Sequence, residues 1–131
     1  MTQENIELVR RCLEARIRGE AETALDLLHP DVVTDMSVRP DGKVYYGRAG
    51  ARKAMQTWLG TWDDYRFEPR EYIDAGQHVV VLWLESGRAK TSGIEMEMEG
   101  ATVWTVTNGQ VVEVRPYTDR AVALEAAGLS E

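Results

Sequence analysis

The periodicity of the sequence changes at Asp63 and Asp64. Before this point, apolar residues mostly recur every three or four positions, which is the spacing of amphipathic helices. After it, apolar and polar residues alternate or apolar residues run together, which is typical of strands. Helices gathered at one end of a chain and strands at the other predict an α+β fold with an antiparallel sheet.

Three helices are predicted in the first half of the chain. They span Glu4 to Arg18, Glu20 to Leu28 and Arg48 to Trp62. Gly19 ends the first helix, because glycine readily adopts the left-handed conformation found after a helix C-terminus. Pro30 ends the second, because the residue before a proline is disfavoured in the helical region.

The predicted strands fall into one isolated segment and one meander. Asp31 to Val38 is a short strand, and Pro40 to Lys43 is a turn that leads toward the third helix. The meander has four strands, which are Arg66 to Ile73, Gln77 to Glu85, Ile94 to Thr107 and Gln110 to Tyr117.

Glycine-containing pairs mark the reversals of this meander. They are Ala75-Gly76, Ser86-Gly87 and Asn108-Gly109. The last pair is a strong hairpin signal, because both residue types tolerate positive φ. A short terminal helix follows, with Asp119 as its N-cap and Gly128 as its stop.

Size and charge restrict the partners that the chain can have. It has 131 residues, so we expect a single domain over residues 1–131. The formal net charge is −7, which disfavours nucleic acids and anionic membranes because both are bound through basic faces. No apolar run approaches the roughly 18 residues that span a bilayer, and the polar N-terminus does not resemble a signal peptide. We expect a cytoplasmic protein without nucleic-acid or membrane partners.

The sequence predicts no metal site and no cofactor. Cys12 is the only cysteine, which excludes an intramolecular disulfide and a cysteine zinc site. His29 and His78 lack metal-ligand spacing, and no glycine-rich phosphate loop follows a strand. Because Cys12 lies on an apolar helix stripe, we expect a packed core thiol there.

Several short segments occur in a characteristic order. They are Gly19-Glu20, Leu28 to Val33, Tyr46 to Arg48, Val103 to Val112, and Tyr117 to Arg120 leading into Ala123 to Leu129. With these segments the chain resembles the nuclear-transport-factor-2-like superfamily, most closely its SnoaL-like branch. The resemblance implies a cone-shaped, cystatin-like α+β fold, in which a curved antiparallel sheet wraps around N-terminal helices and leaves a central pocket. It also implies a homodimer and no shared cofactor.

This superfamily hosts isomerases, cyclases, dehydratases, epoxide hydrolases and non-catalytic binders. Its ketosteroid-isomerase branch uses a tyrosine, an aspartate base and a second acid, and alignment puts Cys12, Met36 and Thr102 near those positions. All three differ, which disfavours ketosteroid-type isomerisation. The epoxide-hydrolase branch needs an Asp-Arg-Asp network, and the later strands show no matching Arg-x-Asp pattern.

Two carboxylates are the candidates for a proton carrier. SnoaL-type cyclases are expected to use a carboxylate in a hydrophobic pocket, where burial raises its pKa toward neutrality. Asp35 and Glu97 are the candidates. Each has a simpler structural interpretation as well. Asp35 is a solvated strand residue in that case, and the alternation from Ile94 to Glu99 puts Glu97 in water.

Aromatic residues are the candidates for the walls of a pocket. We expect substrate contacts from four tryptophans and three polar residues, namely Trp58, Trp62, Trp83, Trp104, Thr102, Arg115 and Tyr117. Large rings can line an apolar cavity and still offer an N–H or O–H group. The leading hypothesis is a protein that binds a small hydrophobic molecule, with acid/base catalysis on a carbonyl-containing metabolite. The alternative is a non-catalytic ligand-binding or dimerisation domain.

Overall fold

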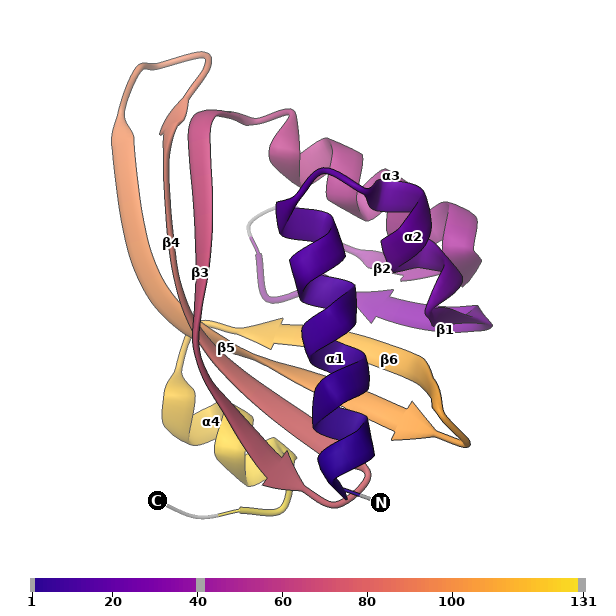
Figure 1. Cartoon of the computed structure of the whole chain (residues 1–131). Helices are drawn as coiled ribbons and strands as arrows, with labels where there is room; N and C mark the ends of the chain where they lie inside the picture. Colours follow the sequence, from indigo (N-terminus) through magenta and orange to yellow (C-terminus); the bar gives the residue numbers. More distant parts are fainter. Residues whose placement is uncertain (1, 40–41, 130–131) are drawn as a thin grey trace.

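One curved sheet wraps around the N-terminal helices in the computed structural model, which describes residues 2–39 and 42–129 (Figure 1). In chain order the elements are α1 (Thr2–Ile17), α2 (Ala21–Asp26), β1 (Leu28–Asp35), β2 (Val44–Tyr46), α3 (Gly47–Leu59), β3 (Trp62–Ala75), β4 (His78–Ala89), β5 (Glu95–Thr107), β6 (Gln110–Tyr117) and α4 (Arg120–Ala126). This confirms the predicted α+β class with N-terminal helices and a curved, mostly antiparallel sheet.

The strands lie in the order β2-β1-β6-β5-β4-β3. The pairs β3–β4, β4–β5 and β5–β6 are antiparallel, as predicted for a meander. The pair β1–β6 is parallel, however. Short turns dictate antiparallel pairing only between consecutive strands, whereas β2, α3 and the first three strands of the meander separate β1 from β6 in the sequence.

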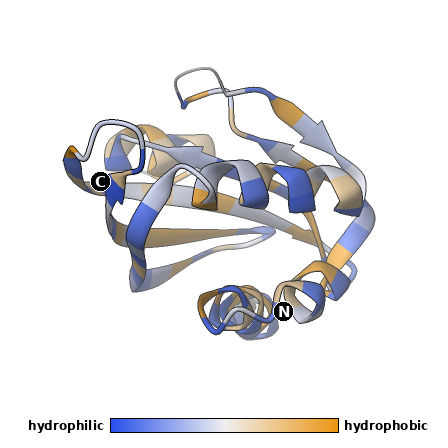
Figure 2. Ribbon diagram, turned by 90° about the horizontal axis from the view of Figure 1, so that it is seen from above, coloured by the Kyte–Doolittle hydropathy of each residue, from blue (hydrophilic) through white to orange (hydrophobic). Residues whose placement is uncertain are grey.

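Both faces of the central strands are covered. In β4, the side chains of Val79, Val81 and Trp83 join a core formed with α1. Val80 and Leu82 alternate with them and join a second core beneath α4. Burial on both faces explains why this strand reads as a continuous apolar run instead of an alternating one. Figure 2 shows hydrophilic and hydrophobic residues interleaved along the helices, as expected of elements with one buried side.

The turn predictions were correct at two positions and wrong at one. Gly76 and the pair Asn108-Gly109 adopt positive φ at the ends of their hairpins. Ser86-Gly87 does not reverse the chain, because β4 continues to Ala89 and the turn follows it. Gly87 serves close packing: a Cβ atom there would lie 3.2 Å from the Cβ atom of Trp62.

Other differences concern the ends of elements. Helix α3 ends at Leu59, so Trp62 begins β3 and does not close the helix. Strand β2 was not predicted, and the predicted turn from Pro40 lies partly outside the described residues. The cap of α4 is confirmed, since the Asp119 side chain accepts a hydrogen bond from the Val122 N–H. Among the described helices, none combines the length and apolarity needed to cross a bilayer.

Candidate functional site

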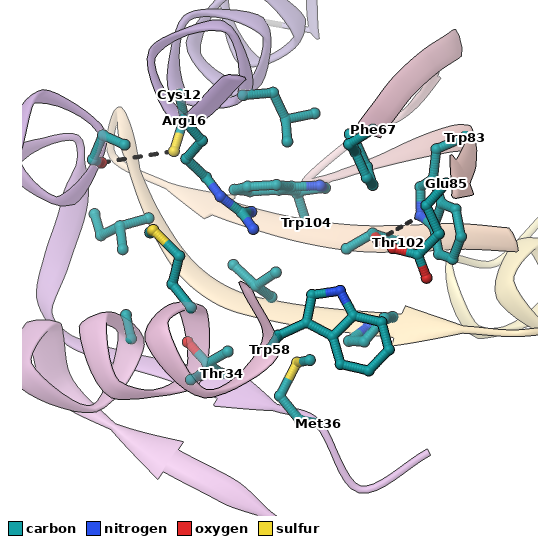
Figure 3. A pocket seen from close by; sticks show the side chains of 18 of the residues that line it. Cys12, Arg16, Thr34, Met36, Trp58, Phe67, Trp83, Glu85, Thr102 and Trp104 are labelled. Carbon is teal, nitrogen blue, oxygen red and sulfur yellow. Dashed lines mark hydrogen bonds between the residues drawn. The ribbon is translucent and has the colours of Figure 1, made fainter. Parts of the chain in front are cut away.

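A cavity of about 90 Å³ lies between the helices and the concave face of the sheet. Helix α1 contributes Cys12 and Leu13, and α3 contributes Trp58. The opposite wall comes from β4 and β5, with Trp83 and Trp104. Figure 3 shows Cys12, Trp58, Trp83 and Trp104 converging on one space. Most of the lining is carbon, which is typical of sites for small organic molecules.

A buried carboxylate faces this cavity. Glu85 in β4 is only 1% exposed and belongs to the cavity lining. It stands two residues after Trp83, and residues two apart in a strand point to the same face. A buried charge is costly unless it is paired and hydrogen-bonded. The neighbours of Glu85 meet this requirement.

The first of these neighbours is Arg39, which precedes the residues outside the described part of the chain. Its Nη1 atom donates to Oε1 of Glu85 at 2.7 Å, and its side chain is 9% exposed. The guanidinium carbon lies 4.1 Å from the ring centroid of Trp58 and 5.5 Å from that of Trp83. The ion pair is therefore held between two indole rings, a favourable place for a guanidinium group.

Tyr65 in β3 is the second neighbour. Its hydroxyl donates to Oε2 of Glu85 at 2.6 Å and accepts from Nε1 of Trp58 at 3.3 Å. Burial and the negative charge of Glu85 raise the pKa of Tyr65 well above its ordinary value. The phenol consequently stays protonated and acts as a hydrogen-bond donor to the carboxylate.

Two tryptophans on adjacent strands differ in how their N–H groups are used. Nε1 of Trp83 donates to the Thr102 hydroxyl at 2.8 Å. Nε1 of Trp104 is buried and has no hydrogen-bond partner among the described residues. Because buried polar groups are nearly always paired, this unpaired donor marks a place where a water molecule or a ligand can accept a hydrogen bond.

The cavity leads to a wider groove of about 560 Å³ at the C-terminal ends of α1 and α3. Leu13, Arg16, Met55, Tyr65 and Phe67 line both spaces. These shared residues form the mouth of the cavity.

The two predicted proton carriers lie elsewhere. Asp35 is bonded by the hydroxyl and the backbone N–H of Ser37 and lies 3.6 Å from Arg115. The Ser37 hydroxyl, with smaller help from the Ser37 N–H and the Arg115 charge, lowers the pKa of Asp35. Glu97 is exposed on β5, between half-buried methionines. Neither residue belongs to the cavity lining, and a catalytic role for either stays a prediction.

The predicted substrate-contacting residues divide into two groups. The cavity brings together Trp58, Trp83, Thr102 and Trp104. Trp62 lies behind Trp58, with ring centroids 5.4 Å apart in an edge-to-face arrangement. Arg115 and Tyr117 stack on each other at 5.3 Å outside the cavity lining.

Sequence reasoning missed Glu85, Arg39 and Tyr65. A signal for Glu85 was present in the alternation that places Val79, Val81 and Trp83 on one face, because its continuation reaches Glu85. The predicted reversal at Ser86-Gly87 ended the strand there and hid this signal. No local pattern pointed to Arg39, which lies 46 residues from its partner.

The described residues contain no group of three or more His, Cys, Asp or Glu side chains arranged to hold a metal ion. Cys12 lines the cavity, and its Sγ atom lies 3.6 Å from the Ala24 carbonyl oxygen. Burial raises the pKa of this thiol to about 11. A thiol with such a pKa is a poor nucleophile near neutrality.

The arrangement combines a fixed carboxylate, an unused indole N–H and apolar walls. A carboxylate has about four lone-pair sites, and the described residues use one on each oxygen of Glu85. The remaining sites can accept a proton or a hydrogen bond, while Trp104 can donate one. Such a pair suits a molecule that carries an oxygen acceptor next to an acidic hydrogen.

Comparison with known proteins identifies the family of this chain. A family model of the SnoaL-like domain matches residues 9–114. Among solved structures, an NTF2-like protein from Burkholderia xenovorans LB400 is 26% identical, with 97% of each chain covered and a TM-score of 0.76. A candidate polyketide cyclase from Xanthomonas campestris pv. campestris is 25% identical, with 90% of this chain and 92% of that chain covered and a TM-score of 0.72.

A third structure, TerC co-crystallised with polyporic acid, is 22% identical, with 95% of this chain and 98% of that chain covered and a TM-score of 0.76. At this identity the likeness shows the fold alone. A search among curated proteins found no match. Because the family model spans most of the sequence, from residue 9 to residue 114, the chain belongs to the SnoaL-like domain family.

Proposed function

We propose that the protein binds a small, largely apolar carbonyl compound in the central cavity and that Glu85 moves a proton on it. The observation that carries this proposal is the burial of Glu85 on the cavity face, with each oxygen fixed by one donor. Buried charges in clefts are candidates for function, because burial alone makes them costly to keep. Asp35 and Glu97 lack this placement.

In the proposed reaction, Glu85 accepts a proton from the carbon next to the carbonyl group. The electron pair of that C–H bond moves toward the carbonyl oxygen, and the N–H of Trp104 donates to the enolate oxygen that results. Return of the proton to the same carbon or to another one completes exchange or isomerisation. Donors aimed at the oxygen that gains charge are the commonest means of lowering such a barrier.

The volumes of the cavity and the groove limit the size of the ligand, whether or not the protein is catalytic. Ligand sites usually measure about 300–1,000 Å³, so a cavity of about 90 Å³ holds only part of such a molecule. The groove outside the mouth supplies the additional space. A ring in the cavity with its substituent in the groove fits both volumes.

The test uses two cyclic aromatic ketones, 1-indanone and 1-tetralone. Binding is followed through the indole N–H signals of ¹⁵N-labelled protein, which has four tryptophans. The signals of Trp58, Trp83 and Trp104 should shift, with Trp104 shifting most. Proton transfer is followed as deuterium uptake at the α-carbon in D₂O.

We expect uptake above the buffer rate with the unaltered protein and with Glu97→Gln, and its loss with Glu85→Gln. Circular dichroism checks that Glu85→Gln is folded, and Tyr65→Phe provides a milder change at the same carboxylate. Indole shifts without deuterium uptake would favour the non-catalytic binder. Uptake that survives in folded Glu85→Gln would exclude Glu85 as the proton carrier.

The resemblance to NTF2-like proteins also predicts a homodimer, and this expectation belongs to the proposal. Light scattering tests it directly. A mass near 14.8 kDa would identify a monomer.

A further inference from the structure

Arg16 lines the cavity, and the proposed reaction gives it no role. It follows Cys12 by four residues on α1, and residues four apart on a helix share a face. Both line the cavity, and Figure 3 shows the Arg16 side chain pointing into it. Arg16 also lines the outer groove. Its guanidinium group therefore stands at the mouth, where a ligand would pass from one space to the other.

The positive charge of Arg16 has no counter-charge among the described residues. Within residues 2–39 and 42–129, no hydrogen bond or ion pair of Arg16 is seen. The two carboxylates that line the cavity and the groove are engaged elsewhere. Glu85 pairs with Arg39 at 2.7 Å, and Glu68 pairs with Arg70 at 3.2 Å. Arg16 is exposed to solvent, and a cation at the rim of a cleft attracts anions toward it through its electric field.

Unused hydrogen-bond donors gather around the same space. Nε1 of Trp104 and Nε of Arg39 are both buried and lack partners among the described residues, and both residues line the cavity. Their side chains are almost fully enclosed, at 2% exposure for Trp104 and 9% for Arg39. Two residues of the cavity lining thus carry donors that the described residues leave unpaired, and an incoming molecule with oxygen acceptors can pair with them.

Arg16 is within electrostatic reach of both walls. Its charge partly offsets the rise in the pKa of the Cys12 thiol on α1. It does the same for the phenol of Tyr65 on β3. The Arg16 charge therefore acts on groups from both the helical wall and the sheet wall of the cavity.

We propose that the natural ligand is an organic acid, whose carboxylate binds Arg16 at the mouth while its apolar ring fills the cavity. This inference rests on the proposed binding function and deepens it by assigning the charge class of the ligand. One negative charge on the ligand can pair with the guanidinium group of Arg16. A carboxylate fits it because guanidinium and carboxylate groups pair through two parallel hydrogen bonds.

The experiment compares benzoate with benzamide, which have nearly the same shape and differ in charge. Both are titrated at low salt and pH 7 against ¹⁵N-labelled protein, up to about 50 mM because ligands of this size bind weakly. The indole N–H signals report occupancy of the cavity. Arg16→Gln removes the charge at the mouth. Arg11→Gln is the matched control, since Arg11 is exposed on the same helix and is not part of the cavity lining.

We expect the protein to bind benzoate at least about tenfold more tightly than benzamide, as charge-assisted hydrogen bonds allow. Arg16→Gln should abolish this preference by weakening benzoate alone, and Arg11→Gln should keep it. Equal affinities for the two probes, or a preference that persists in Arg16→Gln, would overturn the inference while leaving the proposed binding function intact. If neither probe shifts the signals of Trp58, Trp83 and Trp104, the inference fails together with the binding function.

Discussion

The hydroxyl of Tyr65 donates a hydrogen bond to Oε2 of Glu85 across 2.6 Å, from the edge strand of the sheet to its neighbour. The same phenol oxygen accepts from the indole of Trp58 on α3. Tyr65 thereby connects a helix to the buried carboxylate. It fixes one oxygen of Glu85 while Arg39 fixes the other, which keeps the carboxylate in one orientation toward the cavity.

Replacing Tyr65 with phenylalanine should destabilise the protein by about 1–3 kcal/mol, because a buried carboxylate oxygen loses its donor. Urea unfolding followed by circular dichroism measures the change. Tyr46→Phe is the control, since the Tyr46 side chain is 72% exposed and its replacement should leave the midpoint unchanged. Equal midpoints for Tyr65→Phe and Tyr46→Phe would show that the hydrogen bond from Tyr65 to Glu85 does not contribute measurably to stability.

The pair Arg39–Glu85 should show strong coupling in a double-mutant cycle. Either Arg39→Met or Glu85→Gln alone leaves a buried polar partner, and loss of one member of a buried pair typically costs about 3–5 kcal/mol. The double variant should cost clearly less than the sum of the two single variants. The free energies come from urea titrations.

The exposed pair Arg52–Glu22 gives the matched comparison for this cycle. Its side chains are 44% and 74% exposed, and exposed pairs contribute little to stability. Arg52→Met with Glu22→Gln should show no measurable coupling. Strict additivity at Arg39 and Glu85 as well would mean that their ion pair is not formed in solution.

The parts of the fold that depend on local chemistry were predictable. Helical spacing identified α1 to within two residues at each end, and the left-handed conformation at Gly19 ends it as expected. The pair Asn108-Gly109 identified the β5–β6 hairpin, because the turn requires positive φ at both positions. Local conformational preference is enough to specify such features.

Features that depend on distant contacts were not predictable in the same way. Gly87 resembles a turn residue, yet it lies inside β4 because Trp62 approaches the strand closely there. The aromatic walls at Trp58, Trp83 and Trp104 followed from residue type and strand or helix position. The charged centre did not, since Arg39 and Glu85 are 46 residues apart in the sequence and are brought together only by the tertiary fold.

Gly100 in β5 should be intolerant of substitution because of its neighbour Trp83. A Cβ atom at Gly100 would lie 2.5 Å from a ring carbon of Trp83 and 2.8 Å from the carbonyl oxygen of Tyr117. Gly100→Ala should therefore destabilise the protein by about 1–3 kcal/mol through overpacking. Thermal unfolding measures the loss, with Glu99→Ala at the exposed neighbouring position as the control. An unchanged midpoint for Gly100→Ala would show that the ring of Trp83 can move aside.

The Cys12 thiol should make stability fall with rising pH in a defined window. Burial raises the pKa of Cys12 from its ordinary value of 9.0 to about 11. Between these values the unfolded chain loses the thiol proton while the folded chain keeps it, so the unfolded state binds fewer protons and stability decreases as pH rises. This contribution is fully present below pH 9.0 and is lost by about pH 11.

The slope from this single group is at most about 1.4 kcal/mol per pH unit. Urea titrations at pH 8, 9, 10 and 11 should show it as a difference between the unaltered protein and Cys12→Ala. Tyr65 and Tyr72 also have raised pKa values, but they are present in both proteins, and their contribution therefore cancels in the comparison. Parallel pH profiles for the two proteins would show that the thiol is accessible to water in the folded state, and the cavity wall formed by α1 would then be open at Cys12.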